Sequence, residues 1–350
     1  SLPSRGLGDV YKRQVHYDVL VIGGGLSGII SAKIAAKSNL KTLLVDDKKT
    51  LGGSTIFQNN DSFKIDDQHS SKWLEKEINE ISEIENLTVK TRTSIAAYHG
   101  YNYLLARENL TDHLSIKDKK DKIRQRLWKI RAKKVIIATG AIERPLVFNN
   151  NDRPGILLSN SINKYLDYYG VACGKNIILF TNNDSAYETA ISLHKKGIKN
   201  LIVDLRKNSQ SEIAKQAQNL GIKIYFNHVV TNTFGYRRIN SVELMELSDD
   251  GNTTIGNKIK LNCDCLGISG GWTPMVHMHT QSGGKLDFKN DDQVFIPKEI
   301  DNDQISVGAC NGDFDLETII DKTVNKINIF LEINNQDYKN TKVDLSLIHI

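Results

Sequence analysis

Short apolar runs alternate with amphipathic ones along the chain, an order that is typical of β-α-β units. Residues 17–22 (YDVLVI) are apolar β-formers that stop at a run of three glycines, as a buried parallel strand does. Residues 29–37 (IISAKIAAK) then place apolar side chains at helical spacing, and residues 41–46 (KTLLVD) form a second strand-like run. The pattern predicts a first βαβ unit in this part of the chain.

The rest of the pattern predicts a meander followed by a second βαβ unit. Apolar residues at helical spacing in residues 70–84 indicate an amphipathic helix, which a strand at residues 87–91 follows. Further strands are expected at residues 95–105, 127–131, 135–138, 176–180, 201–204, 222–226 and 305–307, with helices at 185–196 and 213–220. In residues 128–133 basic and apolar residues alternate, which indicates a strand with one solvated face.

This order predicts an α/β fold of the two-dinucleotide-binding-domain flavoprotein type, which is glutathione-reductase-like. We expect a discontinuous FAD/NAD-binding domain with a parallel Rossmann-type sheet at residues 15–150 and 263–335. Residues 151–262 are expected as an inserted second βαβ module. No segment approaches the roughly eighteen apolar residues of a membrane span, so we expect no transmembrane segment and no membrane partner.

The two ends of the sequence differ from the rest. Residues 1–14 (SLPSRGLGDVYKRQ) have no hydrophobic periodicity, and we interpret them, like residues 345–350 (LSLIHI), as non-native scars of translated adapter sequence. The alternative is that both are genuine tails. The first scar holds three basic residues and one acidic residue, so its removal lowers the net charge from +5 to +3. The chain is then expected to be a fragment of a longer protein.

Composition and charge narrow the function classes. The 350 residues are 39% hydrophobic and 25% charged, as in an ordinary globular protein. A net charge of +5 spread along the chain does not favour a nucleic-acid partner. Four cysteines without a C-x-x-C pair are too few for a secreted disulfide framework, so a cytoplasmic location is expected.

A glycine-rich turn is the main candidate for cofactor binding. Gly23-x-Gly25-x-x-Gly28 lies between the first predicted strand and helix. Gly23 makes the tight turn, Gly25 lets the backbone approach a pyrophosphate, and Gly28 lets the helix pack on the strand. The helix start at Leu26 and Ser27 offers free amides and a partial positive charge to that anion.

An acidic residue follows the glycine turn at the distance that dinucleotide binding requires. Asp46 stands eighteen residues after Gly28, at the end of the second predicted strand. Its carboxylate is expected to bind ribose hydroxyls, which favours NAD or FAD over NADP, although Lys48 and Lys49 weaken that discrimination.

Further loops are candidates for the same site. Ser54 follows a Gly-Gly pair soon after Asp46, and Gly140 and Gly308 each end a predicted strand. Each of these loops can lie over the cofactor or be an ordinary turn.

The second βαβ unit lacks the features of a phosphate site. Residues 181–186 (TNNDSA) stand where the glycine turn would be, without a glycine and with Asp184 facing the helix start. Bulk and like charge would oppose a pyrophosphate there, so we interpret this module as a scaffold.

The other reactive side chains indicate no catalytic site. His277 and His279 lack a third ligand at useful spacing and are expected to be ordinary surface or interface residues. Cys263 and Cys265 alternate on a predicted strand, so one is expected to face the core, and a disulfide-reductase mechanism is unsupported. The sequence assigns no catalytic residue and no metal site.

Several motifs, in order along residues 17–331, resemble the α subunit of heterotetrameric sarcosine oxidase. They are ATGAIERP (138–145), NDRPG (151–155), YGVACG (169–174), TNND (181–184), SGGWTPMVH (269–277), QSGGK (281–285) and GACNGDFDL (308–316). Related α subunits of opine and other secondary-amine oxidoreductases share much of this pattern.

The resemblance implies a cofactor assignment and a set of partners. In that family the α subunit holds NAD, the β subunit carries FAD and the amine-oxidation site, and FMN lies near the α/β contact. Smaller subunits complete the complex, which converts sarcosine to glycine. A C-terminal aminomethyltransferase-like domain, lying beyond the end of this chain, passes the one-carbon unit to tetrahydrofolate. The isolated fragment is therefore expected to be inactive.

The resemblance also implies individual NAD contacts. They are the glycine turn with Ser27, then Asp46, Asp47, Ser54 and Ile95, and the stretch at 316–318 that begins with Leu316. Asp47 and Lys48 depart from the Glu-Arg-like or Glu-Gln-like pair that is common in the family.

Two other functions remain open from the sequence. One is a self-contained FAD-dependent NAD(P)H oxidoreductase, which the missing second glycine turn and the absent redox cysteines disfavour. The other is a non-catalytic scaffold subunit that holds its nucleotide for structural reasons.

Overall fold

The chain folds into two compact units. The computed structural model describes residues 10–57, 63–120, 122–298, 303–338 and 341–344. One unit contains the described residues up to Thr55 together with 65–141 and 274–344, and the second consists mainly of residues 142–273. The strands β9 (Ala141–Glu143) and β18 (Trp272–Pro274), where the chain passes between the units, pair with each other. The insertion thus extends beyond the 151–262 that the sequence predicted.

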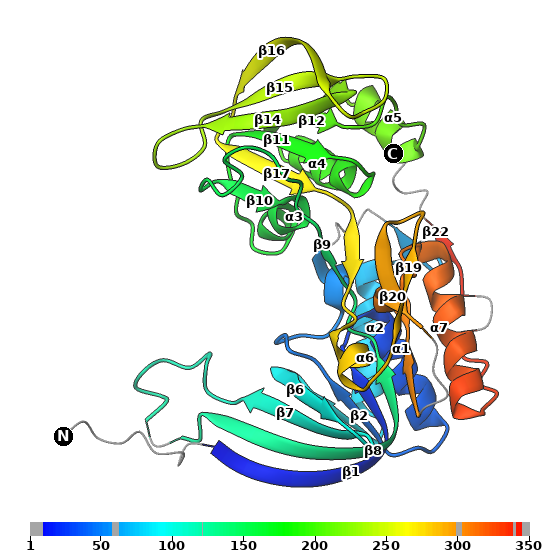
Figure 1. The fold of residues 1–350 in the computed structure, drawn as a ribbon. Coiled ribbons are helices and arrows are strands. Elements are labelled where there is room, and N and C mark those ends of the chain that lie inside the picture. Colours follow the sequence, from blue (N-terminus) through cyan, green and yellow to red (C-terminus); the bar gives the residue numbers. More distant parts are fainter. Residues whose placement is uncertain (1–9, 58–62, 121, 299–302, 339–340, 345–350) are drawn as a thin grey trace. The chain divides into compact units, whose positions relative to one another are not determined.

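The first unit is built on a sheet that combines parallel strands with an antiparallel meander (Figure 1). Its strand order is β5-β2-β1-β8-β7-β6, with β21 paired to β8. The parallel strands are β5 (Leu87–Lys90), β2 (Thr42–Val45), β1 (Val10–Ile22), β8 (Gln125–Ile137) and β21 (Gln304–Ser306), and the meander strands are β6 (Thr93–His99) and β7 (Tyr103–Asn109).

The strand β8 joins the two parts of this sheet. Its first half pairs antiparallel with β7, and its last three residues pair parallel with β21. Trp128, Ile130 and Ala132 are buried while Lys129, Arg131 and Lys133 alternate with them, so the predicted solvated face of this strand is confirmed.

The strand β1 begins earlier than the sequence predicted. Val10 to Gln14 pair with Gln125 to Lys129 of β8, although these five residues belong to the segment interpreted as a scar. Backbone pairing requires no apolar side chains, so the absence of hydrophobic periodicity did not reveal this extension. Residues 1–9 and 345–350, the other parts of the two proposed scars, lie outside the described residues.

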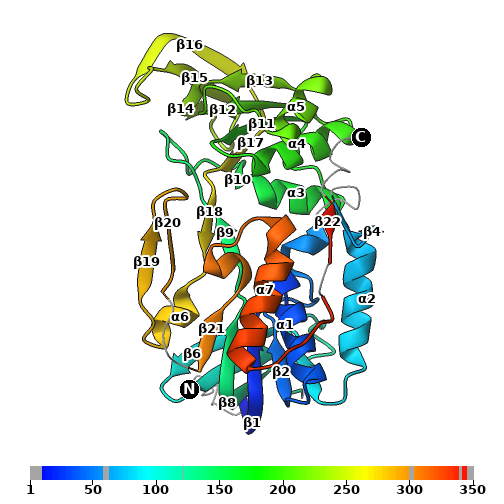
Figure 2. The same cartoon turned by 90° about the vertical axis from the view of Figure 1, so that its right-hand side faces the viewer.

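Three helices cover one face of this sheet. Figure 2 shows α1 (Leu26–Lys37) between α7 (Leu316–Leu331) and α2 (Ser70–Ser82). Nearly every residue of α1 is buried, because the sheet and both neighbouring helices enclose it. The opposite face carries an apolar core that β1, β2, β7 and β8 share. The smaller elements are η2 (Gly53–Phe57), β3 (Lys64–Ile65), β4 (Gln68–His69), α6 (His277–Gln281), β19 (Leu286–Lys289), β20 (Val294–Pro297), η3 (Gly308–Asn311) and β22 (Val343–Asp344).

A buried ion pair joins α1 to α2. Lys33 Nζ lies 2.7 Å from a Glu77 carboxylate oxygen, and both side chains are only 5% exposed. Two more residues complete the group. A carboxylate oxygen of Glu80 lies 2.6 Å from Lys33 Nζ, and the hydroxyl of Tyr338 donates a hydrogen bond to Glu77. Burial lowers the pKa of Lys33, but the bonds to Glu77 and Glu80 outweigh it, so the pKa is raised and the amine stays charged.

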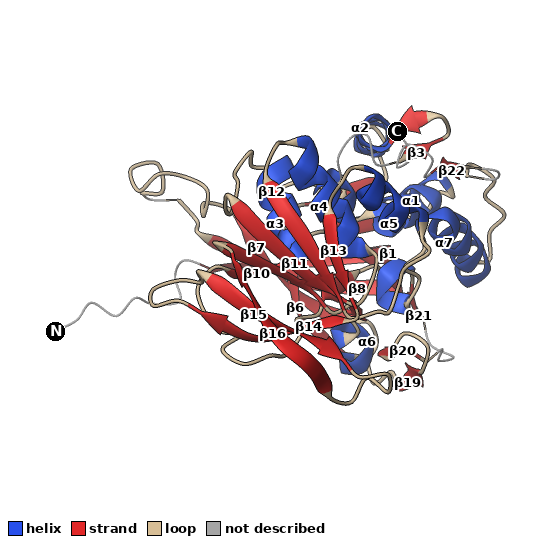
Figure 3. Cartoon of the chain, turned by 90° about the horizontal axis from the view of Figure 1, so that it is seen from above, coloured by secondary structure: helices blue, strands red, loops and turns tan. Residues whose placement is uncertain are grey.

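The second unit has three layers, which Figure 3 shows from above. A parallel sheet of order β10-β17-β11-β12-β13 lies between helices on one face and an antiparallel sheet on the other. The parallel strands are β10 (Ile156–Leu158), β17 (Cys265–Ser269), β11 (Asn176–Thr181), β12 (Lys199–Asp204) and β13 (Lys223–Phe226). The helices are α3 (Ser159–Asp167), α4 (Ser185–Lys195) and α5 (Glu212–Asn219), and the antiparallel strands are β14 (His228–Phe234), β15 (Ser241–Leu247) and β16 (Thr254–Asn262).

The predicted βαβ units and the meander are confirmed in order and type. The expectation for the two neighbouring cysteines is wrong, because Cys263 and Cys265 are both buried. Cys265 lies on β17 and packs on the helix side of the parallel sheet, whereas Cys263 precedes that strand and packs on the side of the antiparallel sheet.

Glu143, on β9, is a buried carboxylate that holds the start of α3. It accepts a 2.8 Å hydrogen bond from the backbone amide of Asn160 and a second bond from Ser269. Burial raises the pKa of Glu143 to about 7, in spite of these two bonds, which lower it.

Among the described residues, no helix is long and apolar enough to cross a lipid bilayer.

We expect Lys33→Ala to lower the free energy of unfolding by about 3–5 kcal/mol, because it leaves the carboxylate of Glu77 buried and unpaired. Lys76→Ala is the matched control. Lys76 lies on α2, the helix that carries Glu77, and pairs with Glu80 at 3.9 Å on the surface. Its loss is expected to change the free energy of unfolding by less than about 0.5 kcal/mol. Urea unfolding of both variants measures the difference. Equal losses in the two would contradict a stabilising role for the buried pair.

Glu143→Gln is expected to change how stability depends on pH. The folded pKa of about 7 lies above the unfolded value, so between about pH 4 and 7 the native state keeps a proton that the unfolded chain releases. Wild-type stability should therefore fall across this window by up to about 3 kcal/mol and level off above it. Glutamine keeps the acceptor for the amide of Asn160 and cannot ionise. The variant should therefore be more stable than the wild type at pH 8 and equally stable at pH 4. Urea unfolding of both proteins from pH 4 to pH 8 measures the difference. If the stability of the two proteins changed equally with pH, the raised pKa of Glu143 would be refuted.

Candidate functional site

The glycine turn is a point of very close packing between α1, β1 and β8. Gly23 has φ of +105°, and a Cβ there would lie 2.3 Å from the carbonyl oxygen of Ala138. A Cβ on Gly28 would lie 1.8 Å from the carbonyl oxygen of Gly23. Neither position accepts a side chain, so these two glycines bring the start of α1 directly against the end of β1.

Gly25 differs from these two glycines, because the protein itself leaves room for a Cβ at this position. Its φ of −76° suits any residue, and the nearest atom to an added Cβ is the Cα of Gly53 at 3.8 Å, an ordinary contact. Gly25 is the N-cap of α1, which has no side-chain cap and no acidic residue in its first turn. The first amides of α1, at Leu26, Ser27 and Gly28, thus lack the internal partners that most helix starts have, which suits an anionic ligand.

Asp46 braces the glycine turn from the end of β2. One carboxylate oxygen accepts from the amide of Gly24 at 2.6 Å, and the other accepts from the amide of Lys48 at 2.7 Å. Asp46 is only 9% exposed, and burial raises its pKa against the lowering effect of these bonds. Each oxygen keeps a second lone pair, so a contact with ribose hydroxyls stays compatible with the bracing role.

Two loops predicted from the sequence lie beside the turn. The amide of Gly52 donates to the carbonyl of Gly24 at 2.7 Å, and a Cβ on Gly53 would lie 2.9 Å from the Cα of Gly25. On the other side, a Cβ on Gly308 would lie 2.4 Å from Ser27 Oγ. The structure therefore brings the loops after β2 and β21 to the start of α1.

Ser27 is held in place by the last helix. Thr323 of α7 donates a 3.1 Å hydrogen bond to Ser27 Oγ, and both residues are buried.

Gly140 has φ of +73° and open space where its side chain would be, and its carbonyl accepts from the amide of Met275 at 2.9 Å.

The remaining predicted contacts are placed less tightly. Asp47 is exposed and pairs with Lys48 at 2.9 Å, and Ser54 is exposed within η2. Ile95 packs against the apolar core from β6, and Leu316 is the partly buried first residue of α7. The cofactor roles of these residues, like those of the glycine turn, Asp46, Gly140 and Gly308, stay predictions.

In the second unit the equivalent turn is filled by the chain's own side chains. Arg206 Nη2 lies 2.6 Å from a carboxylate oxygen of Asp184, at the start of α4, and 2.8 Å from one of Asp204, at the end of β12. The hydroxyl of Tyr187 also donates to Asp204, at 2.7 Å. A carboxylate and a guanidinium thus occupy the place that a phosphate takes in a working site.

The thiols have no arrangement suited to redox catalysis. All four cysteines are free, and burial raises the pKa of Cys263 and of Cys265 to about 12. Thiols with such pKa values are protonated at neutral pH and react slowly. In the part of the chain that the structure describes, no group of three or more side chains is placed to hold a metal ion.

The expectation that His279 is a surface or interface residue is wrong. It is buried rather than on the surface, and its ring contacts Gln304 and the carbonyl of Lys285. Neither the spacing of His277 and His279 nor the sequence near Gln304 signalled this, because the three segments meet only in the fold.

Comparison with known proteins agrees with this geometry. A family model described as pyridine nucleotide-disulphide oxidoreductase matches residues 17–296. Sarcosine oxidase subunit alpha of Corynebacterium sp. (strain P-1) is 35% identical over 303 residues, which cover 86% of this chain and 31% of the relative. Sarcosine oxidase subunit alpha of Rhizobium meliloti (strain 1021) is 30% identical over 305 residues, which cover 86% of this chain and 29% of the relative. The chain therefore spans about a third of the length of these curated relatives.

A solved structure shows the same fold. Thioredoxin reductase of T. acidophilum superposes with a TM-score of 0.65 at 16% identity, covering 91% of this chain and 97% of the reductase. The two-dinucleotide-binding-domain fold and the resemblance to sarcosine oxidase α subunits are both confirmed. Because the family model covers most of its length, the chain belongs to the pyridine nucleotide-disulphide oxidoreductase family.

Proposed function

We propose that this chain is the NAD-binding portion of the α subunit of a sarcosine oxidase complex, an oxidoreductase acting on the CH–NH group of its donor. The observation that carries the proposal is the uncapped start of α1 behind Gly25, on a chain that is 35% identical to such a subunit. In the intact complex, sarcosine is demethylated to glycine, with FAD and FMN in the assembly and the one-carbon unit passed to tetrahydrofolate.

The residues of the glycine turn fit a dinucleotide. The amides at the start of α1 would hold the pyrophosphate, and Gly25 leaves the space through which it approaches. Asp46 would accept from the adenosine ribose while it continues to brace Gly24. Gly53 and Gly308 would place backbone beside the ligand, where side chains would collide with Gly25 or Ser27. A bound NAD would supply a nicotinamide ring able to accept a hydride.

The second unit is best understood as a scaffold. Its anion position is filled internally, because Arg206 pairs with both Asp184 and Asp204. The two carboxylates outnumber the one guanidinium, which supports the absence of a second nucleotide from this module. This arrangement disfavours a self-contained FAD-dependent NAD(P)H oxidoreductase, which needs both sites. The buried, protonated thiols disfavour disulfide reduction. Two alternatives stay open. The chain can be the α subunit of an opine or other secondary-amine oxidoreductase, which differs from the proposal in the amine that is oxidised. It can also be a scaffold subunit that holds its nucleotide for structural reasons.

Identification of the bound nucleotide is the most direct experiment. The whole chain is expressed and denatured, and the released nucleotide is identified by mass and absorbance. Release of NAD without turnover supports the proposal. A yellow protein that releases FAD and reduces an acceptor with NADH alone would overturn it. Co-purification with a β subunit and oxygen consumption with sarcosine, other N-methyl amines and opines then identify the substrate.

Gly25→Leu is expected to abolish NAD retention and to lower thermal stability less than Gly28→Ala, because an added Cβ on Gly25 meets only the Cα of Gly53 at 3.8 Å. Gly28→Ala is expected to lower stability as well, since its Cβ would lie 1.8 Å from a backbone carbonyl oxygen. Gly100→Leu is the control, because nothing lies within 4 Å of an added Cβ on that exposed turn. Equilibrium dialysis with NAD and thermal unfolding measure the two effects. Full NAD retention by Gly25→Leu would disprove the location of the site.

A further inference from the structure

The carboxyl ends of β2 and β5 lie side by side in the first unit. The amide of Asp46 donates to the carbonyl of Lys90 at 2.9 Å. Two residues further along, the amide of Arg92 donates to the carbonyl of Lys48 at 2.8 Å. In open α/β sheets, ligands bind beyond these strand ends, and the acid that ends the second strand takes the ribose hydroxyls. With a ribose at Asp46, the cations Lys48 and Arg92 are neighbours of its 2′ position.

Arg92 is the type of residue that recognises the extra phosphate of NADP. An arginine near the end of the second strand accommodates this 2′-phosphate, since a guanidinium binds phosphate through two parallel N–H groups. The backbone of Arg92 is held on both sides, because its carbonyl also accepts from the amide of Asn109 at 2.9 Å. Its φ of +52° is uncommon for a residue other than glycine. The chain thus carries a fixed arginine beside the acid that favours NAD.

Asp112 occupies the guanidinium of Arg92. Nη1 of Arg92 donates to both carboxylate oxygens of Asp112, at 2.8 and 2.9 Å. The loop after β7 holds Asp112 in turn, since the ring of His113 lies 3.4 Å from its carboxylate and Lys119 Nζ donates to its carbonyl at 3.4 Å. A 2′-phosphate could use Arg92 only by displacing this carboxylate.

The lysines at these strand ends also pair with acids of the chain. Lys48 Nζ lies 2.9 Å from Asp47, but both side chains are more than half exposed, where such pairs are weak. Lys90 Nζ lies 3.5 Å from Glu108, on side chains that are less than a fifth exposed. The side chain of Arg92 is only 27% exposed, so of the two cations next to the 2′ position Arg92 is the more firmly held.

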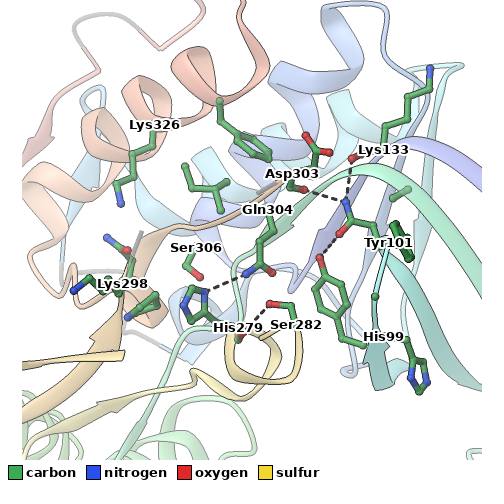
Figure 4. A pocket seen from close by; sticks show the side chains of 18 of the residues that line it. His99, Tyr101, Lys133, His279, Ser282, Lys298, Asp303, Gln304, Ser306 and Lys326 are labelled. Atoms are coloured by element: carbon green, nitrogen blue, oxygen red, sulfur yellow. Dashed lines mark hydrogen bonds between the residues drawn. The ribbon is translucent and has the colours of Figure 1, made fainter. Parts of the chain in front are cut away.

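A cavity of about 950 Å³ beside Gln304 lies apart from these strand ends (Figure 4). His279, Gln304 and Ser306 line it, and none of its lining residues belongs to the glycine turn or to the ends of β2 and β5. This cavity therefore takes no part in choosing between the two dinucleotides.

We propose that Asp112 makes the dinucleotide site selective for NAD over NADP, by holding the guanidinium of Arg92 that would otherwise bind a 2′-phosphate. Asp112 acts through Arg92 and is a positioning residue. The inference rests on the proposed function, because it takes the glycine turn and Asp46 to hold a dinucleotide. Selectivity is a difference of two affinities, so this role moves the NADP affinity and leaves the NAD affinity in place.

Equilibrium dialysis of the whole chain with NAD and with NADP tests this role. The wild type is expected to bind NADP at least about tenfold more weakly than NAD. Asp112→Asn keeps the shape of the side chain and removes its charge, so it is expected to lower the Kd for NADP about tenfold and to change the Kd for NAD less than about twofold. Asp287→Asn is the matched control, because Asp287 is an exposed aspartate of β19 that pairs with Lys298 at 3.5 Å. An equal gain in NADP affinity in both variants, or no gain in Asp112→Asn, would overturn the proposal.

A double variant separates holding of Arg92 from simple repulsion. Asp112→Asn with Arg92→Gln is expected to return the Kd for NADP to the wild-type value, since the phosphate then has no guanidinium to bind. A gain that persists without Arg92 would refute the positioning role. Wild-type protein that binds NAD and NADP equally well would overturn this inference alone, whereas wild-type protein that binds neither would overturn the proposed function as well.

Discussion

The close packing of α1 against the end of β1 is the constraint on which the candidate site depends. Gly23 lies so near the carbonyl of Ala138, and Gly28 so near that of Gly23, that a side chain fits at neither position. This contact fixes where α1 starts and leaves its first turn without a side-chain cap. Asp46 then holds the turn from β2 through the amide of Gly24, and the loops after β2 and β21 approach the same point. One steric requirement thus organises four separate segments.

The two units show how little the shared βαβ order decides by itself. In the first unit the helix start is open to an anion, because Gly25 carries no side chain and no acid follows it in the first turn. In the second unit Asp184 stands at the helix start, and Arg206 pairs with it and with Asp204. The same topology therefore gives a candidate ligand site in one unit and an internally paired turn in the other, and a few side chains make the difference.

Most of the fold could be predicted from the sequence, because hydrophobic periodicity records which faces are buried. Both βαβ units, the meander and the glycine turn follow from it. The extension of β1 to Val10 could not, since backbone pairing leaves no periodic trace there. The burial of both Cys263 and Cys265 depends on the layers that cover the two faces of the parallel sheet of the second unit. The ring of His279 contacts Gln304, which lies 25 residues further along the chain.

The glycine turn and the cavity beside Gln304 differ in how far the sequence reveals them. At the glycine turn, backbone amides make the site, so the glycines must stand at fixed spacing on one short segment and a motif reveals them. The cavity beside Gln304 is lined by side chains instead, and Lys298, Gln304 and Lys326 come from the end of a hairpin, a strand and a helix. No spacing rule links such residues along the sequence. A cavity of this kind therefore becomes visible only once the fold has brought its segments together.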